Sequence, residues 1–251
     1  MVSKKVFYYE TIDSTNIQAA RLAKEGAKHG CVVIAKEQTA GKGRRGREWE
    51  SPKDENIYMS ILLRPEMEPS KAPMLTLVMA YSVARSLCKK GFDNVQIKWP
   101  NDVIIGGKKI CGILTEMELA GNEISHVVIG VGINVNTKGF SKELKEKATS
   151  LYLESGKIQE MEELQKDIME TFWADYEQFV TDGDLSFLKE SYNRILVNQE
   201  REVRVLEPGH EYTAYAVGIN NNGELLVRTA DGEEHAIYAG EVSVRGVYGY
   251  I

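Results

Sequence analysis

The sequence is poor in the residue types that mark disulfide frameworks and metal sites. Its 251 residues include only three cysteines and four histidines. Cys31, Cys88 and Cys111 lie in apolar contexts without C-x-x-C spacing, which predicts buried, reduced thiols in a cytoplasmic protein. The histidines show no metal-ligand spacing, and the motifs G-x-S-x-G and H-E-x-x-H are missing. The sequence therefore predicts neither metal ligands nor a hydrolytic triad.

Long apolar runs and an excess of positive charge are also missing. No stretch approaches the ~18 apolar residues of a membrane span, and the N-terminal segment MVSKKVFYYETIDS has no apolar core like that of a signal peptide. With 31 Lys+Arg and 37 Asp+Glu, the formal net charge is −6. This balance argues against a general DNA- or membrane-binding protein.

The charge is nevertheless unevenly distributed. Residues 42–47 (KGRRGR) contain four positive charges and no negative charge, which leaves 27 positive and 37 negative residues elsewhere, a balance of −10. A six-residue cationic segment in an acidic chain indicates an anionic ligand or a solvated loop. The four like charges and three neighbouring glycines favour no compact state by themselves.

Hydrophobic periodicity predicts an α+β domain followed by a small β-barrel domain. We place the boundary between residues 195 and 196, so that the domains cover 1–195 and 196–251. A helix should begin at the N-cap Ser14, present Ala27 on its apolar face and stop at Gly30. Other helices are predicted from Pro73 to near Gly91, with an apolar run over 74–88, and over 161–179, and residues 39–56 are predicted to form a loop. Strands are predicted at 6–11, 31–35, 57–63, 95–99, 103–105, 109–119 and 124–135, and then from 198 onward with turns at Pro208-Gly209, Asn222-Gly223 and Asp231-Gly232.

The loop contains G-x-G-x-x-G (Gly41, Gly43 and Gly46), a weak signal alone. A dinucleotide site needs a helix directly after the glycines, and the sequence EWESP that follows is a poor helix start. The Walker pattern also fails, because Arg47-Glu48 replaces Lys-Ser/Thr. Glycines that admit a ligand beside anion-binding arginines remain one interpretation, and a solvated basic loop the other.

Four further motifs each have a structural and a functional interpretation. KWPND (98–102) is either an Asx turn or a strand end that places polar groups in a cleft. Lys109 in GGKKICGIL (106–114) is either an edge-strand lysine that reaches solvent or a cation that needs a buried anion. The two glycines in GVGINVN (130–136) indicate a bulge or a close approach by a ligand. DSTN (13–16) serves as a helix cap, or as a cap with additional ligand contacts.

In this order, the motifs DSTN, EQTAGKGRRGREW, KWPND, GKKICGIL and GVGINVN resemble the biotin protein ligases (biotin–[acetyl-CoA-carboxylase] ligases). They cover residues 13–136, and ATSL (148–151) and the C-terminal β segment resemble that family too. The resemblance implies a catalytic domain built on a mixed β-sheet flanked by helices, followed by an SH3-like barrel. Because the catalytic domain begins by about residue 6, the chain resembles the monofunctional type without an N-terminal DNA-binding domain.

The resemblance also implies the chemistry. Biotin and ATP, with Mg²⁺, would form biotinyl-5′-AMP, and a lysine of the biotin carboxyl carrier protein of acetyl-CoA carboxylase would accept the biotin. A homodimer is expected from the family. Lys109 and Arg44 are the expected catalytic residues. The expected biotin-binding residues are Ser14, Thr15, Asn16, Gln38, Gly41, Lys42, Gly43, Arg44, Lys109, Gly112 and Gly132, with Gly130 beside the biotin tail. The expected ATP- and adenylate-binding residues are Arg44, Arg47, Trp49, Asn101, Asp102, Lys109 and Asn134.

One departure concerns the adenine. Some relatives have a tryptophan shortly before the position of Ser150-Leu151, but Ala148-Thr149 stand here, which puts the aromatic cover of the adenine in doubt. Two alternatives remain: a lipoate– or octanoate–protein ligase with the same acyl-adenylate chemistry, and a non-enzymatic binding module that uses the basic loop. The polar set at 14–16 and 38 favours the ureido ring of biotin over the first alternative.

Overall fold

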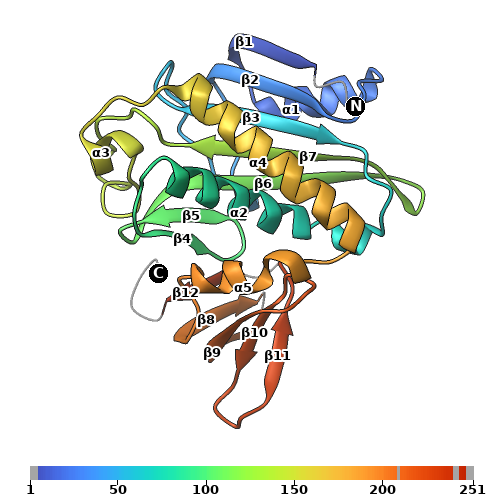
Figure 1. The fold of residues 1–251 in the computed structure, drawn as a ribbon, viewed down its shortest axis with the longest axis vertical. Coiled ribbons are helices and arrows are strands. Elements are labelled where there is room, and N and C mark those ends of the chain that lie inside the picture. The colour runs from blue at the N-terminus through green and yellow to red at the C-terminus, as the bar shows by residue number, and fades with distance from the viewer. Residues whose placement is uncertain (1–4, 208–209, 240–242, 247–251) are drawn as a thin grey trace. The chain divides into compact units, whose positions relative to one another are not determined.

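The structure, a computed structural model, describes residues 5–207, 210–239 and 243–246 (Figure 1). The chain divides into two compact units. The first unit comprises Met1–Thr76 and Ile110–Lys166, and the second comprises Leu77–Lys109 and Asp167–Ile251. The α+β class is confirmed, with a seven-stranded mixed sheet and a separate five-stranded sheet. The predicted division at residue 195 stays a prediction.

The first unit is built on five strands in the order β1-β2-β3-β7-β6. β1 pairs parallel with β2, whereas the β2–β3, β3–β7 and β6–β7 pairs are antiparallel. Ala19, Leu22 and Ala23 of helix α1 pack in one apolar cluster with Val33 and Leu62 of the sheet. The elements are β1 (Val6–Ile12), α1 (Thr15–Lys24), β2 (Cys31–Gln38), the 3₁₀ turns η1 (Arg44–Gly46) and η2 (Pro69–Lys71), β3 (Ile57–Leu63), β6 (Lys108–Ala120), β7 (Glu123–Ile133) and α3 (Leu151–Ser155).

The predicted end of the first helix was wrong. Helix α1 stops at Lys24, and Gly26 follows in the left-handed conformation with φ +88°. The Arg64 guanidinium donates hydrogen bonds to the carbonyl oxygens of Ala23 (2.7 Å) and Ala27 (3.1 Å). A left-handed glycine and a cationic donor both satisfy carbonyls at a helix C-terminus, so the chain turns before it reaches Ala27.

One half-buried histidine, His29, and one buried histidine, His126, predict how the stability of this unit depends on pH. His29 Nδ1 accepts a hydrogen bond from the backbone N–H of Arg64 at 3.0 Å, and His126 is 4% exposed. Burial lowers the pKa of both His29 and His126. The unfolded chain therefore takes up protons first as the pH falls below about 6.5. The free energy of unfolding should decrease from pH 6.5 to 5, above the range in which most carboxylates titrate.

Urea denaturation at half-unit pH intervals from 8 to 5 measures this dependence. A double variant with His29→Asn and His126→Gln has no imidazole at these positions and should show a flatter acid slope. A wild-type stability that is constant down to pH 5 would contradict the expectation.

The second unit contains two long helical segments and the β4–β5 pair. Leu77, Val83 and Leu87 of α2 are fully buried or nearly so, and α4 buries Ile168 and Phe172 on its apolar face, as predicted. Cys88 is exposed, so the prediction that all three thiols are buried was wrong; it lies in the last turn of α2, beyond the buried stretch. The elements are α2 (Met74–Lys89), β4 (Val95–Lys98), β5 (Asp102–Ile105), α4 (Met161–Asp182) and α5 (Ser186–Arg194), of which α2 and α4 begin in the first unit.

Five short antiparallel strands follow α5, in the order β11-β10-β9-β8-β12. Gly223 (φ +75°) and Gly232 (φ +91°) occupy two of the predicted turns, and the third turn, at Pro208-Gly209, lies outside the described residues. The pairing described for 201–246 is that of an open sheet, so SH3-like closure stays a prediction. The strands are β8 (Arg201–Glu207), β9 (His210–Ile219), β10 (Leu225–Arg228), β11 (Glu234–Ile237) and β12 (Ser243–Gly246). Among the described residues, no helix combines the length and apolar character that a membrane crossing requires.

Candidate functional site

The segment Asp13–Asn16 places four polar side chains at the start of α1. Ser14 occupies the N-cap position, but its side chain makes no capping hydrogen bond, so capping does not account for this residue. The Asp13 carboxylate instead accepts a hydrogen bond from the Ser14 backbone N–H (2.7 Å) and pairs with Arg21 (2.6 Å). Asp13 therefore anchors the helix start, and Ser14 and Thr15 are buried beside it without a role in helix capping.

A chain of hydrogen bonds connects the predicted biotin-binding residues of β2 and α1. Gln38 Oε1 accepts from the backbone N–H (2.8 Å) and the hydroxyl (3.1 Å) of Thr15, and Gln38 Nε2 donates to Ser51 Oγ (2.9 Å). Ser60 Oγ lies 2.8 Å from Thr15 Oγ1 and 2.7 Å from Asn16 Oδ1. The structure thus brings Thr15, Asn16 and Gln38 into one network.

Ser60, at the centre of this network, was missed by the sequence analysis. Its relative exposure is 0%, and its hydroxyl contacts both Thr15 and Asn16 of the DSTN motif. The signal was available, because Ser60 is the one polar side chain other than tyrosine in the apolar strand IYMSILL. A buried hydroxyl in such a strand needs a hydrogen-bond partner.

The two glycines of β7 lie under side chains. A Cβ atom at Gly130 would clash with Asn16 Oδ1, and one at Gly132 would be 2.6 Å from Trp49 Cε2. β3 and β7 pair in continuous register through both glycines, so the bulge interpretation was wrong. Gly112 of β6 is the register partner of Gly132. The glycines are needed because the Asn16 amide and the Trp49 indole approach the strand closely.

The cationic loop forms a short hairpin. The Trp49 N–H donates to Gly41 O (2.9 Å) and the Gly43 N–H to Arg47 O (2.7 Å), while Lys42 and Glu48 form an antiparallel bridge. At the tip, Arg45 (φ 58°, ψ 40°) and Gly46 (φ 69°) are both left-handed, as in a type I′ turn. The clustered charges and glycines of this loop predict no compact structure, but backbone hydrogen bonds and this turn hold it together.

The second unit contains Lys109, the predicted cationic site residue that lies outside the cationic loop. Lys109 Nζ lies 2.6 Å from Asp102 Oδ1, and the two side chains are 25% and 13% exposed. Asp102 opens β5 opposite Lys98, so the KWPND segment does form the β4–β5 turn, with a cis peptide before Pro100. The interpretation of Lys109 as an edge-strand lysine was wrong, because β6 lies between β7 and β5 in the sheet order. Asp102 balances the charge of Lys109.

Asn134 lies at the end of β7 in the first unit and is 6% exposed. Its Nδ2 donates to Thr149 O at 3.1 Å, which ties the GINVN segment to the ATSL segment. Ser150 caps α3 by accepting a hydrogen bond from the Leu153 N–H.

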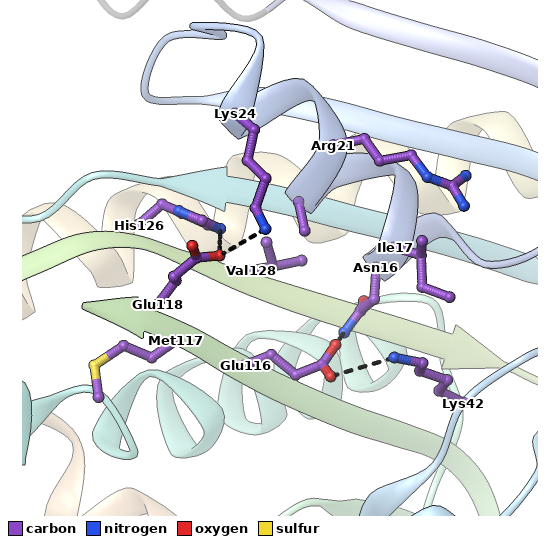
Figure 2. Close-up of a pocket in the computed structure, with 11 residues that line it drawn as sticks. Asn16, Ile17, Arg21, Lys24, Lys42, Glu116, Met117, Glu118, His126 and Val128 are labelled. Atoms are coloured by element: carbon purple, nitrogen blue, oxygen red, sulfur yellow. Dashed lines mark hydrogen bonds and ion pairs between the residues drawn. The ribbon is translucent and has the colours of Figure 1, made fainter. Parts of the chain in front are cut away.

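An open cavity of about 330 Å³ lies beside α1 in the first unit (Figure 2). Asn16 and Lys42 are the two predicted site residues on its wall, and they face Glu116. In the part of the chain that the structure describes, no three acidic, histidine or cysteine side chains could hold a metal ion together. The wall comprises Asn16, Ile17, Ala20, Arg21, Lys24, Lys42, Glu116, Met117, Glu118, His126 and Val128.

The predicted site residues thus fall into two sets. The first unit holds Ser14, Thr15, Asn16, Gln38, Gly41, Lys42, Gly43, Arg44, Arg47, Trp49, Gly112, Gly132 and Asn134. The second unit holds Asn101, Asp102 and Lys109. Each set has its own polar contacts, and the roles of individual residues toward a ligand stay predictions.

Comparison with known proteins assigns the chain to a family. Residues 8–134 match the biotin/lipoate A/B protein ligase family, and residues 200–245 match the biotin protein ligase C-terminal domain. The bifunctional ligase/repressor BirA of Bacillus spizizenii is 36% identical over 248 residues, which cover 97% of this chain and 75% of that protein. A biotin–[acetyl-CoA-carboxylase] ligase of Paracoccus denitrificans is 40% identical over 125 residues, which cover 49% of this chain and 51% of that protein.

Among solved structures, the biotin protein ligase of Aquifex aeolicus in complex with biotin and ATP superposes with a TM-score of 0.83 at 29% identity. The match covers 97% of this chain and 99% of that one. The chain therefore belongs to the biotin/lipoate A/B protein ligase family, and within it to the biotin protein ligases.

Proposed function

We infer that this protein activates biotin with ATP as biotinyl-5′-AMP and transfers the biotin to a lysine of the biotin carboxyl carrier protein of acetyl-CoA carboxylase. The observation that carries the inference to this chain's own residues is the buried network of Thr15, Asn16, Gln38 and Ser60. Hydroxyl and amide groups suit a ureido ring, which offers two N–H donors and one carbonyl acceptor.

In the first step, a biotin carboxylate oxygen attacks the α-phosphorus of ATP, and the bond to the β-phosphate breaks with release of pyrophosphate. In the second step, the acceptor lysine amine attacks the acyl carbon, loses a proton and releases AMP. The first step brings two anionic groups together, and the second develops negative charge on the attacked acyl group and on the departing AMP, so the protein's main contribution is alignment and charge neutralisation. We assign neutralisation to Lys109 and Arg44, with Arg47 on the phosphates.

Mg²⁺ is proposed to enter with ATP rather than in a protein cage. No three acidic, histidine or cysteine side chains gather into a metal site in the described residues, and Mg²⁺ commonly binds through substrate phosphates and water. It would neutralise phosphate charge during the attack.

The polar network also bears on the alternative substrate class, because the matched family includes lipoate ligases. A dithiolane ring or a plain acyl chain offers no N–H donor to the acceptor capacity that this network retains, such as the second lone pair of Asn16 Oδ1. Calorimetric competition should show that biotin binds and that lipoate does not displace it. Displacement by lipoate at similar concentration would favour the alternative.

Several finer assignments belong to the proposal. The catalytic domain would cover 1–195 and the SH3-like domain 196–251, which is supported by the C-terminal family match beginning at residue 200. A cytoplasmic location is supported by Cys31, Cys88 and Cys111, none of which forms a disulfide within the described residues. A homodimer is proposed because C₂ dimers are the commonest oligomers. The net charge of −6 supports the absence of DNA binding.

The direct test is incubation of the purified protein with biotin, MgATP and a biotin carboxyl carrier domain. Pyrophosphate release should depend on biotin, and the mass of the acceptor should increase by one biotinyl group. An acceptor whose target lysine is replaced by arginine is the control and should stay unmodified. Absence of both signals would refute the function.

A further inference from the structure

Glu116 on β6 belongs to none of the motifs, yet it contacts two of the proposed biotin-binding residues (Figure 2). Its Oε2 accepts a hydrogen bond from Asn16 Nδ2 at 2.7 Å, and its Oε1 lies 3.7 Å from Lys42 Nζ. Asn16 is 4% exposed, whereas the side chains of Glu116 and Lys42 are each 45% exposed. The contact with Asn16 is therefore the shorter and better shielded of the two, and solvent weakens the other.

The surroundings of Asn16 fix the direction of its amide. Nδ2 donates to Glu116 Oε2 and also to Leu114 O at 3.2 Å, which uses both of its protons. A carboxylate and a carbonyl only accept hydrogen bonds, so the nitrogen must face them. Oδ1 then faces the Ser60 hydroxyl at 2.7 Å. The polar capacity left to Asn16 is the second lone pair of Oδ1, an acceptor.

We propose that Glu116 is a positioning residue for head-group recognition, which acts through Asn16 to present a fixed acceptor to a ring N–H of biotin. The proposal rests on the proposed function. Asn16 Oδ1 lies over Gly130, so a small rotation of the amide would move it off the strand surface. Without Glu116, one Nδ2 proton loses its acceptor and the amide loses this restraint.

A rival role for Glu116 is that of counter-ion to Lys42. The two roles differ in their dependence on the ligand's carboxylate. Biotinol has the same ring system as biotin but ends in an alcohol, so it reports ring recognition without the charge. Loss of a ring contact should lower the affinity for biotin and for biotinol by the same factor. Loss of the counter-ion to Lys42 should change the affinity for biotin alone.

The experiment is isothermal titration calorimetry of biotin and biotinol with the full chain. Glu116→Ala should weaken both ligands by about tenfold, since a hydrogen bond to a charged group contributes about that factor. Glu116→Gln keeps an acceptor oxygen for Asn16 and should restore binding to within about threefold. Glu116→Asp keeps the charge, but its side chain is one methylene shorter, so its carboxylate should not reach Asn16. Its affinities for both ligands should match those of Glu116→Ala.

Glu118→Ala is the matched control. Glu118 lies two residues farther along β6 and pairs with Lys24 (3.5 Å) and His126 (3.8 Å), outside the Asn16 network. It should leave both affinities unchanged. Unchanged binding by Glu116→Ala, or an effect on biotin but not on biotinol, would overturn the proposal while the proposed function stands. Failure of the unaltered protein to bind either ligand would instead overturn the proposed function, and this proposal with it.

Discussion

Replacement of Lys109 by alanine is expected to slow formation of the biotinyl adenylate by about 10²- to 10³-fold, the usual cost of removing one group that stabilises charge in a transition state. Lys109 is 25% exposed and lies 2.6 Å from Asp102. In the reaction we expect its ammonium to neutralise the negative charge shared by the biotin carboxylate and the α-phosphate. Biotin-dependent pyrophosphate release under single-turnover conditions measures this step.

The controls separate chemistry from folding. Lys108→Ala removes the neighbouring charge from the opposite face of the strand and should leave the rate near wild type. Lys109→Arg keeps a charge beside Asp102, so its unfolding midpoint should match wild type, although the rate should still fall because guanidinium geometry differs from that of an ammonium. A folded Lys109→Ala variant with an unaltered rate would refute the assigned role.

Replacement of Asp175 by alanine is expected to cost about 2–3 kcal/mol of folding free energy. Asp175, on α4, is 5% exposed. It accepts hydrogen bonds from Ser82 Oγ (2.8 Å) and Arg85 (2.6 Å) on α2. The variant leaves a buried hydroxyl and a cation without this partner. Because Arg85 is 41% exposed, water can hydrate its guanidinium in the variant, which reduces the loss of folding free energy.

Urea denaturation compares this variant with Asp167→Ala, two turns earlier on the same helix. Asp167 pairs with Lys90 at 2.9 Å but is 37% exposed, so its loss should cost less than about 0.5 kcal/mol. Asp175→Asn keeps an acceptor for Ser82, so its loss of unfolding free energy should lie between those of Asp167→Ala and Asp175→Ala. Equal losses for Asp167→Ala and Asp175→Ala would show that burial of Asp175 does not decide its contribution.

Most elements could be predicted because local patterns determine them. The apolar run of β3, the Gly106-Gly107 turn and the three-to-four-residue spacing in α4 all specify their structure without distant contacts. The end of α1 could not be predicted, because Arg64, about forty residues away in the sequence, supplies the donors that cap its carbonyls. A helix that ends through tertiary contacts carries only a weak local signal.

The same distinction applies to the site. Thr15 and Gln38 belong to motifs that occur along the chain in the order typical of the family, so they could be predicted from the sequence. The hydrogen bond between them could not. Ser60 and Glu116 lie in strands that were predicted from their apolar residues alone, and neither residue belongs to a motif. Their partners are 44 and 100 residues away from them at Asn16. Only the sheet register, which aligns β3 and β6 on either side of β7, brings these residues together.

The hairpin within the cationic loop has a consequence for conformational entropy. Fixing the backbone of a flexible residue costs about 1–2 kcal/mol, so ordering a disordered segment would consume much of a ligand's interaction energy. Here the Lys42–Glu48 bridge and the turn at Arg45 restrict the backbone of this segment through contacts within the chain itself. The binding energy of biotin and ATP can therefore appear as affinity rather than offset the ordering of a long, flexible lid.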